Sequence, residues 1–397
     1  MNNSIAFLLG AGFSVPMEYP TGAKLNDLLL ACTGNDFNFS TEGVLVNLTD
    51  GRKPDRNFKG PNGIECDFCC KLIQHFNKNK GKFDYEEFCD YLYNDAIKDP
   101  EAEGLLKVDY YKIKQDLKYM LSSSKIIYPQ LVDHFLVDGN GNSWYENAMN
   151  LFEPRNIGYN GILDFLQKFC EDNIINVHTL NHDLFFEHLV VSDGLREKFC
   201  DGFEELGSPY YGDLTTANGG LFKCRLQYYD GKYDKKIRLF KLHGSKDYCR
   251  YFRSEKSIFT LENYVKIRWG IGLTSLFKEN NGKDGKLTYE ECSINYHADI
   301  LTGITSKIAR YKEPLLFGKL FDNFKKNLQN ADKLIIIGYG GKDQEINNMI
   351  LKYFDFENKP SYIIDPFPST ATEFLKGKLG ARPIVKRLQD VEMKDLI

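Results

Sequence analysis

No apolar run in the sequence is long enough to cross a bilayer, and neither sign of charge dominates. The first run, Ile5 to Leu9, is short, and no Lys or Arg precedes it to form the basic start of a signal peptide. The net charge of -4 gives no general attraction to nucleic acid or to an anionic membrane. We therefore expect a cytoplasmic protein with no membrane partner and no direct, sequence-specific contact with nucleic acid.

The sequence also lacks internal repeats, long low-complexity tracts and a disulfide framework. Its ten cysteines are scattered, with Cys69 and Cys70 adjacent, a distribution typical of reduced thiols in an intracellular protein. The 397 residues suffice for about two domains, or for one large domain with insertions. An apolar share of 42% predicts an ordinary globular fold with a buried core.

Short apolar runs, each ending at Gly, Asn, His or Asp, recur along the chain. Runs rich in Ile, Leu and Val and separated by helical patterns predict buried parallel strands. They are Ile5 to Leu9, Ile174 to Leu180, Ile237 to Leu242, Leu334 to Ile337 and Tyr362 to Ile364. The sequence therefore predicts an α/β fold, a Rossmann-like parallel sheet flanked by helices. Ligands of such sheets bind at the carboxyl ends of the strands, where the polar and glycine residues fall.

The distance between the first two runs indicates an insertion. About 160 residues separate them, far more than one crossover needs. Apolar and aromatic residues recur at helical spacing between residues 84 and 136. We predict a mainly helical insertion at 51–150, and a second insertion or small subdomain at 251–312, where the pattern is irregular. The predicted discontinuous core comprises 1–50, 151–250 and 313–397.

The segment IAFLLGAGFSVP, residues 5 to 16, places two glycines directly after the first predicted strand. Gly10 and Gly12 suit a turn that brings the backbone against a pyrophosphate, because a Cβ would block both turn and ligand. A plain tight turn explains them about equally well, since the third small residue of a dinucleotide fingerprint is missing. Pro16 and Pro20 predict an extended loop covering a cofactor, before a helix that begins near Thr21.

Polar residues follow the second predicted strand in the segment VHTLNHDLFFEHL. Asn181 and Asp183 can hydrogen-bond sugar hydroxyls or hold a water at this position, or can simply cap the following helix. His178, His182 and His188 match no ligand spacing of a metal site, so we expect no metal there.

The later predicted strands also end in candidate functional residues. His243 can act as a general base near neutral pH, although a lone His-Gly pair is common in proteins. In IIIGYGGKDQ, a glycine turn with Gly338 and Tyr339 leads to a helix capped by Asp343. The N-terminus of that helix offers backbone amides to an anion. Asp365 can bind a ribose or start the next turn.

The segments GAGFS, TLNHD, KLHGS and IIIGYGG, in this order and each after a predicted strand, resemble the sirtuin family. The likeness is closer to the sirtuin-like NAD hydrolases of bacterial anti-phage defence, which carry Leu or a similar residue where sirtuins have Gln, as Leu180 does. It covers residues 4–30, 160–250 and 315–370. The resemblance implies that NAD is the substrate and that NAD depletion arrests an infected cell.

The resemblance also implies roles for individual residues. Asn181 would contact the nicotinamide ribose and position the attacking water, and His243 would be the base or the partner of a ribose hydroxyl. The candidate cofactor-binding residues are Gly10, Ala11, Gly12, Phe13, Ser14, Asp183, Gly338, Tyr339 and Asp365.

The sequence departs from sirtuin deacylases at two places. The loop's second proline is followed by Thr-Gly-Ala where deacylases have Asp-Phe-Arg, and the two Cys-x-x-Cys pairs of their zinc ribbon are missing after the His-Gly pair. Only Cys249 and Cys292 lie beyond that point, and Cys66 with Cys69 forms a single pair, so we expect no structural zinc. Both departures disfavour deacylation of protein lysine.

These residues favour hydrolysis of the nicotinamide glycosidic bond. The bond breaks through an oxocarbenium-like state, so the protein must fix the ribose and deliver water, and it needs no metal. We predict an NAD glycohydrolase that acts as the effector of an abortive-infection anti-phage system. Alternatives are a sirtuin-like protein deacylase or ADP-ribosyltransferase, and a non-catalytic sensor of NAD or ADP-ribose. Because unchecked activity would kill the host, we expect a gated homo-oligomer with an activating partner, such as a DNA-translocase-type ATPase or another sensor.

Overall fold

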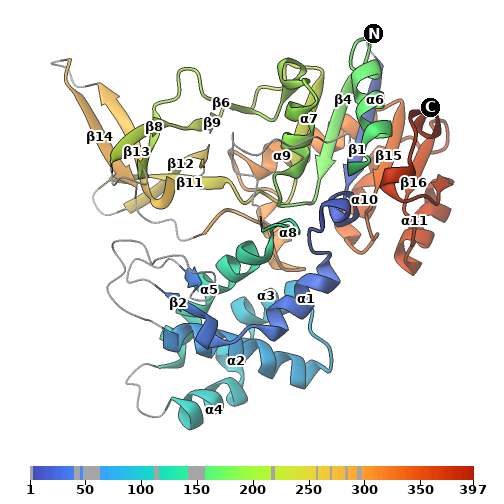
Figure 1. The fold of residues 1–397 in the computed structure, drawn as a ribbon. Helices are drawn as coiled ribbons and strands as arrows, with labels where there is room; N and C mark the ends of the chain where they lie inside the picture. The colour runs from blue at the N-terminus through green and yellow to red at the C-terminus, as the bar shows by residue number, and fades with distance from the viewer. Residues whose placement is uncertain are drawn as a thin grey trace.

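The described residues form a parallel sheet with its helices, a group of helices beside it, two four-stranded antiparallel sheets and a short two-stranded sheet of β2 (Phe37–Phe39) and β3 (Leu45–Asn47) (Figure 1). The computed structural model describes residues 3–39, 45–47, 63–110, 116–141, 157–215, 220–255, 258–268, 271–281, 285–292 and 297–397.

The main sheet has seven strands in the order β17-β16-β15-β1-β4-β10-β5, and every neighbouring pair is parallel. Its strands are β1 (Ser4–Leu9), β4 (Ile174–Thr179), β5 (Phe199–Cys200), β10 (Ile237–Lys241), β15 (Lys333–Ile337), β16 (Ser361–Ile364) and β17 (Arg382–Ile384). All five predicted strands are therefore confirmed, and so is the α/β class. The edge strands β5 and β17 were not predicted, because two or three residues leave no apolar run to recognise.

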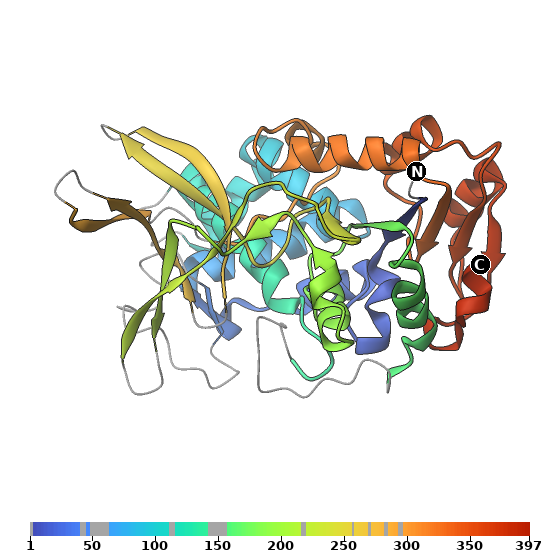
Figure 2. The same ribbon diagram turned by 90° about the horizontal axis from the view of Figure 1, so that it is seen from above.

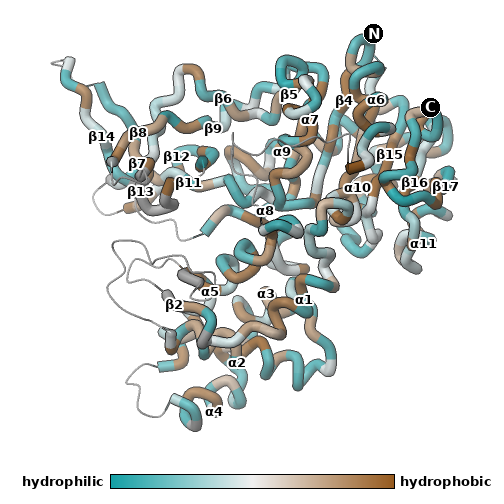
Figure 3. The backbone as a smooth tube through the Cα atoms, viewed as in Figure 1, coloured by the Kyte–Doolittle hydropathy of each residue, from teal (hydrophilic) through white to brown (hydrophobic). Residues whose placement is uncertain are grey.

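Alternate residues of each central strand face opposite sides of this sheet. In β1, Ile5, Phe7 and Leu9 pack on one side, and Ala6 and Leu8 pack on the other. The first side is covered by α6 (Asn160–Phe169) and α7 (Phe185–Ser192), and the second by α9 (Phe317–Asn330), α10 (Gln344–Tyr353) and α11 (Thr370–Leu379). Figure 2 shows α9 in orange on one side and α6 and α7 in green on the other. Hydrophobic stretches, brown in Figure 3, lie in the parallel sheet, as burial on both faces requires.

The strand order reverses next to β1. From β1 the chain passes to β4 and then to β10 on one side, and it later returns to β15 on the other side before reaching β16 and β17. The switch point of the sheet therefore lies between β1 and β15. In open α/β sheets, ligands bind outside the carboxyl ends of the strands at such a point.

Five helices, which we call the helical module, share a separate hydrophobic core. They are α1 (Gly22–Ala31), α2 (Gly63–Lys80), α3 (Tyr85–Asn94), α4 (Pro100–Asp109) and α5 (Leu117–Phe135). The Thr21 side chain accepts a hydrogen bond from Lys24 N, which confirms the predicted helix start. Although α1 precedes the predicted insertion, it packs with the helices of that insertion. Within the described residues, no helix combines the length and apolarity that a bilayer crossing needs.

Between β5 and α8 (Ser306–Arg310), the described residues form two four-stranded antiparallel sheets, and β10 of the main sheet lies between their strands in the sequence. Their strands are β6 (Phe203–Glu204), β7 (Tyr210–Thr215), β8 (Leu221–Arg225), β9 (Gln227–Tyr229), β11 (Tyr248–Glu255), β12 (Ile258–Lys266), β13 (Ile271–Asn281) and β14 (Leu287–Cys292). The sequence pattern here looked irregular because burial does not alternate: β12 is exposed in its first residues and buried only in its last. The fold of this region depends on which strands pair with each other, and this pairing cannot be predicted from the local sequence pattern.

Candidate functional site at the carboxyl edge of the parallel sheet

Two glycine loops pack against each other at the switch point. Gly12 N donates a hydrogen bond to Gly338 O at 2.9 Å, and Gly10 N donates to Ile337 O at 3.0 Å. A Cβ on Gly12 would lie 2.7 Å from Gly338 Cα, and one on Gly10 would lie 2.7 Å from Tyr339 Cα. Gly338 itself has a φ of 58°. The glycines are thus required by contact between the two loops, a reason different from the approach of a pyrophosphate that the sequence suggested.

The loop after β1 is compact. Residues 11–17 form two successive 3-10 turns, so the extended loop expected from Pro16 and Pro20 is not present. Phe13 is buried and its ring packs on Tyr159, so this side chain belongs to the core. Ala11 is exposed at the edge of the sheet.

A hydrogen-bond network joins the ends of β1 and β4. The buried Ser14 donates from Oγ to Asp183 Oδ2 at 2.9 Å. Asn181 Nδ2 donates to Gly10 O at 3.0 Å and lies 3.1 Å from Ser14 Oγ. Asp183 Oδ1 accepts from Phe185 N, the first residue of α7, so the Asp183 carboxylate binds both the start of this helix and Ser14. The structure therefore brings together Gly10, Ser14, Asn181 and Asp183.

His243 lies in the loop after β10 and is almost completely buried. Its Nε2 is 3.5 Å from Asp343 Oδ2 and 3.5 Å from the Tyr311 hydroxyl. Burial lowers the pKa of His243 well below its ordinary value, and the positive charge of Lys307 lowers it further. The imidazole is consequently neutral at pH 7, the form that accepts a proton.

A buried ion cluster that the sequence did not reveal adjoins His243. Lys307 Nζ, on α8, lies 2.9 Å from Asp343 Oδ2 and 3.0 Å from Glu86 Oε2, on α3. Burial alone would lower the pKa of Lys307, but the two carboxylates raise it above its ordinary value. Asp343 was predicted only as a helix cap, and it does cap α10, since its Oδ1 accepts from Ile346 N. Glu86 and Lys307 lie 221 positions apart, so no local motif could have paired them.

The remaining candidates make structural hydrogen bonds. The Tyr339 hydroxyl donates to Asp343 O at 3.0 Å, which ties the glycine loop to the start of α10. Asp365 Oδ1 accepts from Phe367 N at 2.9 Å, the bond expected if Asp365 starts a turn. Both residues follow strands of the main sheet, and their hydrogen bonds hold the loops after β15 and β16.

His178 and the pair of Cys66 and Cys69, which were considered for metal binding, lie in structural positions. His178 is in the core, with Nδ1 3.0 Å from Phe7 O and Nε2 3.1 Å from Asn327 Nδ2, and burial lowers its pKa to about 3. Cys66 and Cys69 are buried on α2, and burial raises the pKa of both thiols. Across the described ranges, no group of three or more His, Cys, Asp or Glu side chains is arranged to hold a metal ion.

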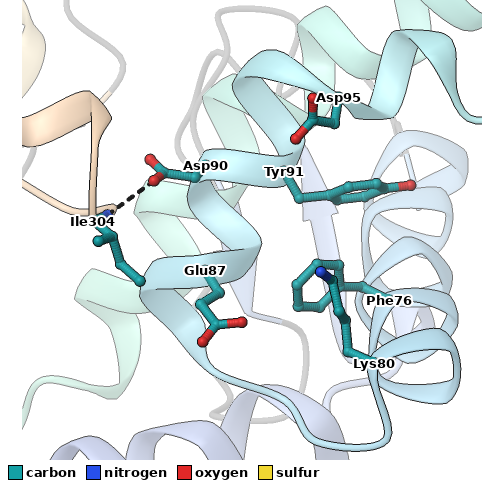
Figure 4. A pocket seen from close by; sticks show the side chains of 7 residues that line it. All are labelled: Phe76, Lys80, Glu87, Asp90, Tyr91, Asp95 and Ile304. Carbon is teal, nitrogen blue, oxygen red and sulfur yellow. Dashed lines mark hydrogen bonds between the residues drawn. The ribbon is translucent and has the colours of Figure 1, made fainter.

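A surface pocket of about 340 Å³ lies on the helical module (Figure 4). It is lined by Phe76, Lys80, Glu87, Asp90, Tyr91, Asp95 and Ile304. None of these residues belongs to a loop at the carboxyl edge of the sheet. The pocket is therefore separate from the candidate site.

The comparisons with known proteins give distant similarities. No protein-family model matches the sequence, and no curated protein matches it. A structure of Sir2 enzymes is similar with a TM-score of 0.33 and 11% identity, over 100% of this chain and 90% of that chain. A mutant Sir2 homologue in complex with 2′-O-acetyl ADP ribose has a TM-score of 0.37 and 12% identity, over the same shares. A structure concerned with sirtuin substrate affinity has a TM-score of 0.29 and 12% identity, over 96% and 94%. Scores this low do not assign the chain to a family.

Proposed function

We propose that the protein hydrolyses NAD to nicotinamide and ADP-ribose. The observation that carries the proposal is the combination, at one sheet edge, of the Ser14–Asn181–Asp183 network with the buried His243. This edge lies next to the switch point between β1 and β15, where α/β sheets bind nucleotides. The order of the strand-end motifs, which resembles that of sirtuins, supports the same substrate.

The proposed reaction breaks one bond and forms one bond at C1′ of the nicotinamide ribose. The electron pair of the glycosidic bond leaves with nicotinamide, and C1′ passes through an oxocarbenium-like state. Water adds to C1′ and gives its proton to His243, directly or through a ribose hydroxyl. Asn181 orients the ribose and the water, a role that depends on placement to within about 1 Å.

The biological setting is a further part of the proposal. We infer an effector of anti-phage defence that stops an infected cell by depleting its NAD, and the support for this role is the motif resemblance. Since such an activity must be held in check, we also propose a gated homo-oligomer activated by a partner protein or another sensor. The candidate partners include a DNA-translocase-type ATPase.

Product analysis tests the proposed reaction. Chromatography of NAD incubated with the protein and with candidate activators should show nicotinamide and ADP-ribose in equal amounts. Asn181→Ala should reduce turnover by about two orders of magnitude, because the water and the ribose lose their alignment. Asn173→Ala is the matched control: this residue precedes β4 at the opposite edge of the sheet, where its side chain bonds Phe169 O.

Other results would contradict NAD hydrolysis and would support one of the alternative functions. Consumption of NAD only with an acylated peptide would indicate a deacylase, and ADP-ribose attached to protein would indicate a transferase. Binding of NAD without turnover under every activating condition would indicate a sensor.

A further inference from the structure

The charged groups around His243 come from three separate parts of the chain. Asp343 precedes α10 of the sheet region, Lys307 lies on α8, and Glu86 lies on α3 of the helical module. We propose that Asp343 positions His243, and that Lys307, held by Glu86, controls how strongly Asp343 acts on the imidazole. This inference rests on the proposed function, because it takes His243 as the base.

The two oxygens of Asp343 have different partners. Oδ1 accepts from Ile346 N at 3.2 Å and is thereby fixed to the start of α10. Oδ2 lies 2.9 Å from Lys307 Nζ and 3.5 Å from His243 Nε2. One carboxylate oxygen is therefore shared between a permanent cation and the imidazole. An N–H on Nε2 facing this oxygen leaves Nδ1 as the atom that accepts a proton.

The charges of the cluster balance only when His243 is protonated. Glu86 and Asp343 supply two negative charges, and Lys307 supplies one positive charge. The imidazolium formed when His243 takes a proton would neutralise the remaining charge. Asp343 therefore favours the protonated state, whereas Lys307 opposes it by competing for the same oxygen.

The groups facing His243 leave few other sources of charge. His182 lies beside it, with ring centroids 6.3 Å apart, and burial lowers the pKa of His182 to about 3. Burial raises the pKa of Tyr311, so that hydroxyl is neutral. Among the described residues, the charged neighbours at pH 7 are thus Asp343 and Lys307, with Glu86 behind them.

The helical module fixes where the lysine lies. Asp90, one turn after Glu86 on α3, accepts from Thr305 N at 2.7 Å and from Ser306 N at 3.1 Å, at the start of α8. Asp90 also accepts a hydrogen bond from Ile304 N, which Figure 4 shows as a dashed line. One helix of the module therefore holds both the partner of Lys307 and the segment that carries it. Figure 1 shows α8 between the module and the sheet.

An NMR titration of the full chain tests the inference without requiring turnover. Protein labelled with ¹³C at the histidine Cε1 gives signals for seven histidines, and the His243 signal is the one missing from His243→Gln. Lys307→Met removes the cation, which stabilises the imidazolium, so the pKa of His243 should rise by about one to three units. Adding Asp343→Asn, which keeps the helix cap, should reverse that rise. Lys307→Arg should leave the titration close to that of the wild type.

A matched control removes a different lysine that also bridges two carboxylates. Lys71 lies 3.1 Å from Asp67 Oδ2 and 3.3 Å from Asp109 Oδ2 within the helical module. Lys71→Met should not move the His243 signal. If Lys307→Met unfolds the protein, a second test combines Glu86→Gln with Lys307→Arg. Without the Glu86 charge, the cation at position 307 is less neutralised, so the pKa of His243 should be lower in the double variant than in Lys307→Arg alone.

The outcomes separate this inference from the proposed function. A His243 titration that Lys307→Met leaves unchanged in a folded protein, or that Lys71→Met moves equally, overturns the inference. Where NAD is cleaved, the acidic limb of the rate profile should move to higher pH in Lys307→Met, together with the NMR titration. A shifted titration in a protein that never cleaves NAD supports the electrostatic coupling and overturns the proposed function.

Discussion

The strand-end loops and the helical module contribute to the site by different kinds of contact. The loops after β1, β4 and β15 are held by short contacts to the backbone, in which Gly12 and Gly338 touch and the Asn181 side chain donates to Gly10 O. The module acts through charged side chains that pair with residues from distant parts of the chain, as in the pair of Glu86 on α3 with Lys307 on α8. Backbone contacts tolerate almost no added volume, whereas ion pairs can be weakened stepwise. The loops therefore set the shape of the site, and the module can adjust its electrostatics.

The largest effect should come from adding volume between the glycine loops. Gly12→Val places a side chain against Gly338 Cα, so we expect a loss of about 3 kcal/mol in the free energy of unfolding, together with loss of NAD binding. Urea denaturation measures the free energy of unfolding, and calorimetric titration with NAD measures binding. Gly340→Val, in the same glycine turn but with open space around its Cβ position, should cost less than about 0.5 kcal/mol. Equal losses in both variants would mean that the contact between the loops is not what requires Gly12.

A smaller effect should follow from loosening the module. Asp90→Ala removes the acceptor of the backbone N–H groups at the start of α8, and we expect it to cost about 1 kcal/mol. Hydrogen exchange should report faster exchange at Thr305 and Ser306, with the amides of β1 unchanged. Asp95→Ala, on the exposed end of the same helix, is the control. Faster exchange in β1 as well would show that the two regions are not distinct.

The sequence predicted the parts of the molecule that depend on local pattern. Runs of Ile, Leu and Val identified five strands of the main sheet, and Thr21 and Asp343 identified helix starts. Asn181 and His243 could be placed at one edge because parallel strands end together. The glycines were recognised, but the contact that requires them joins residues 12 and 338 and became visible only in the fold.

The charged half of the site could not be predicted for a physical reason. A buried lysine can be predicted only when its carboxylate partners are known. The partners of Lys307 are Glu86 and Asp343, which lie far from it in the sequence and are brought together by the tertiary fold. The residues around Lys307 show no periodic pattern of apolar side chains, because the short helix α8 buries little of its surface. The antiparallel strands were missed similarly, because their order in the sheets follows long-range pairing.

The most direct test of the central claim separates binding from chemistry at His243. His243→Ala should keep the NAD affinity within a few fold, since the glycine loops and the Ser14 network remain intact. Its turnover should fall by about two to four orders of magnitude, the usual range for loss of a general base. Circular dichroism checks the fold, and calorimetry with product chromatography on the activated protein measures both quantities. Near-normal turnover in His243→Ala would contradict the assignment of His243 as the base.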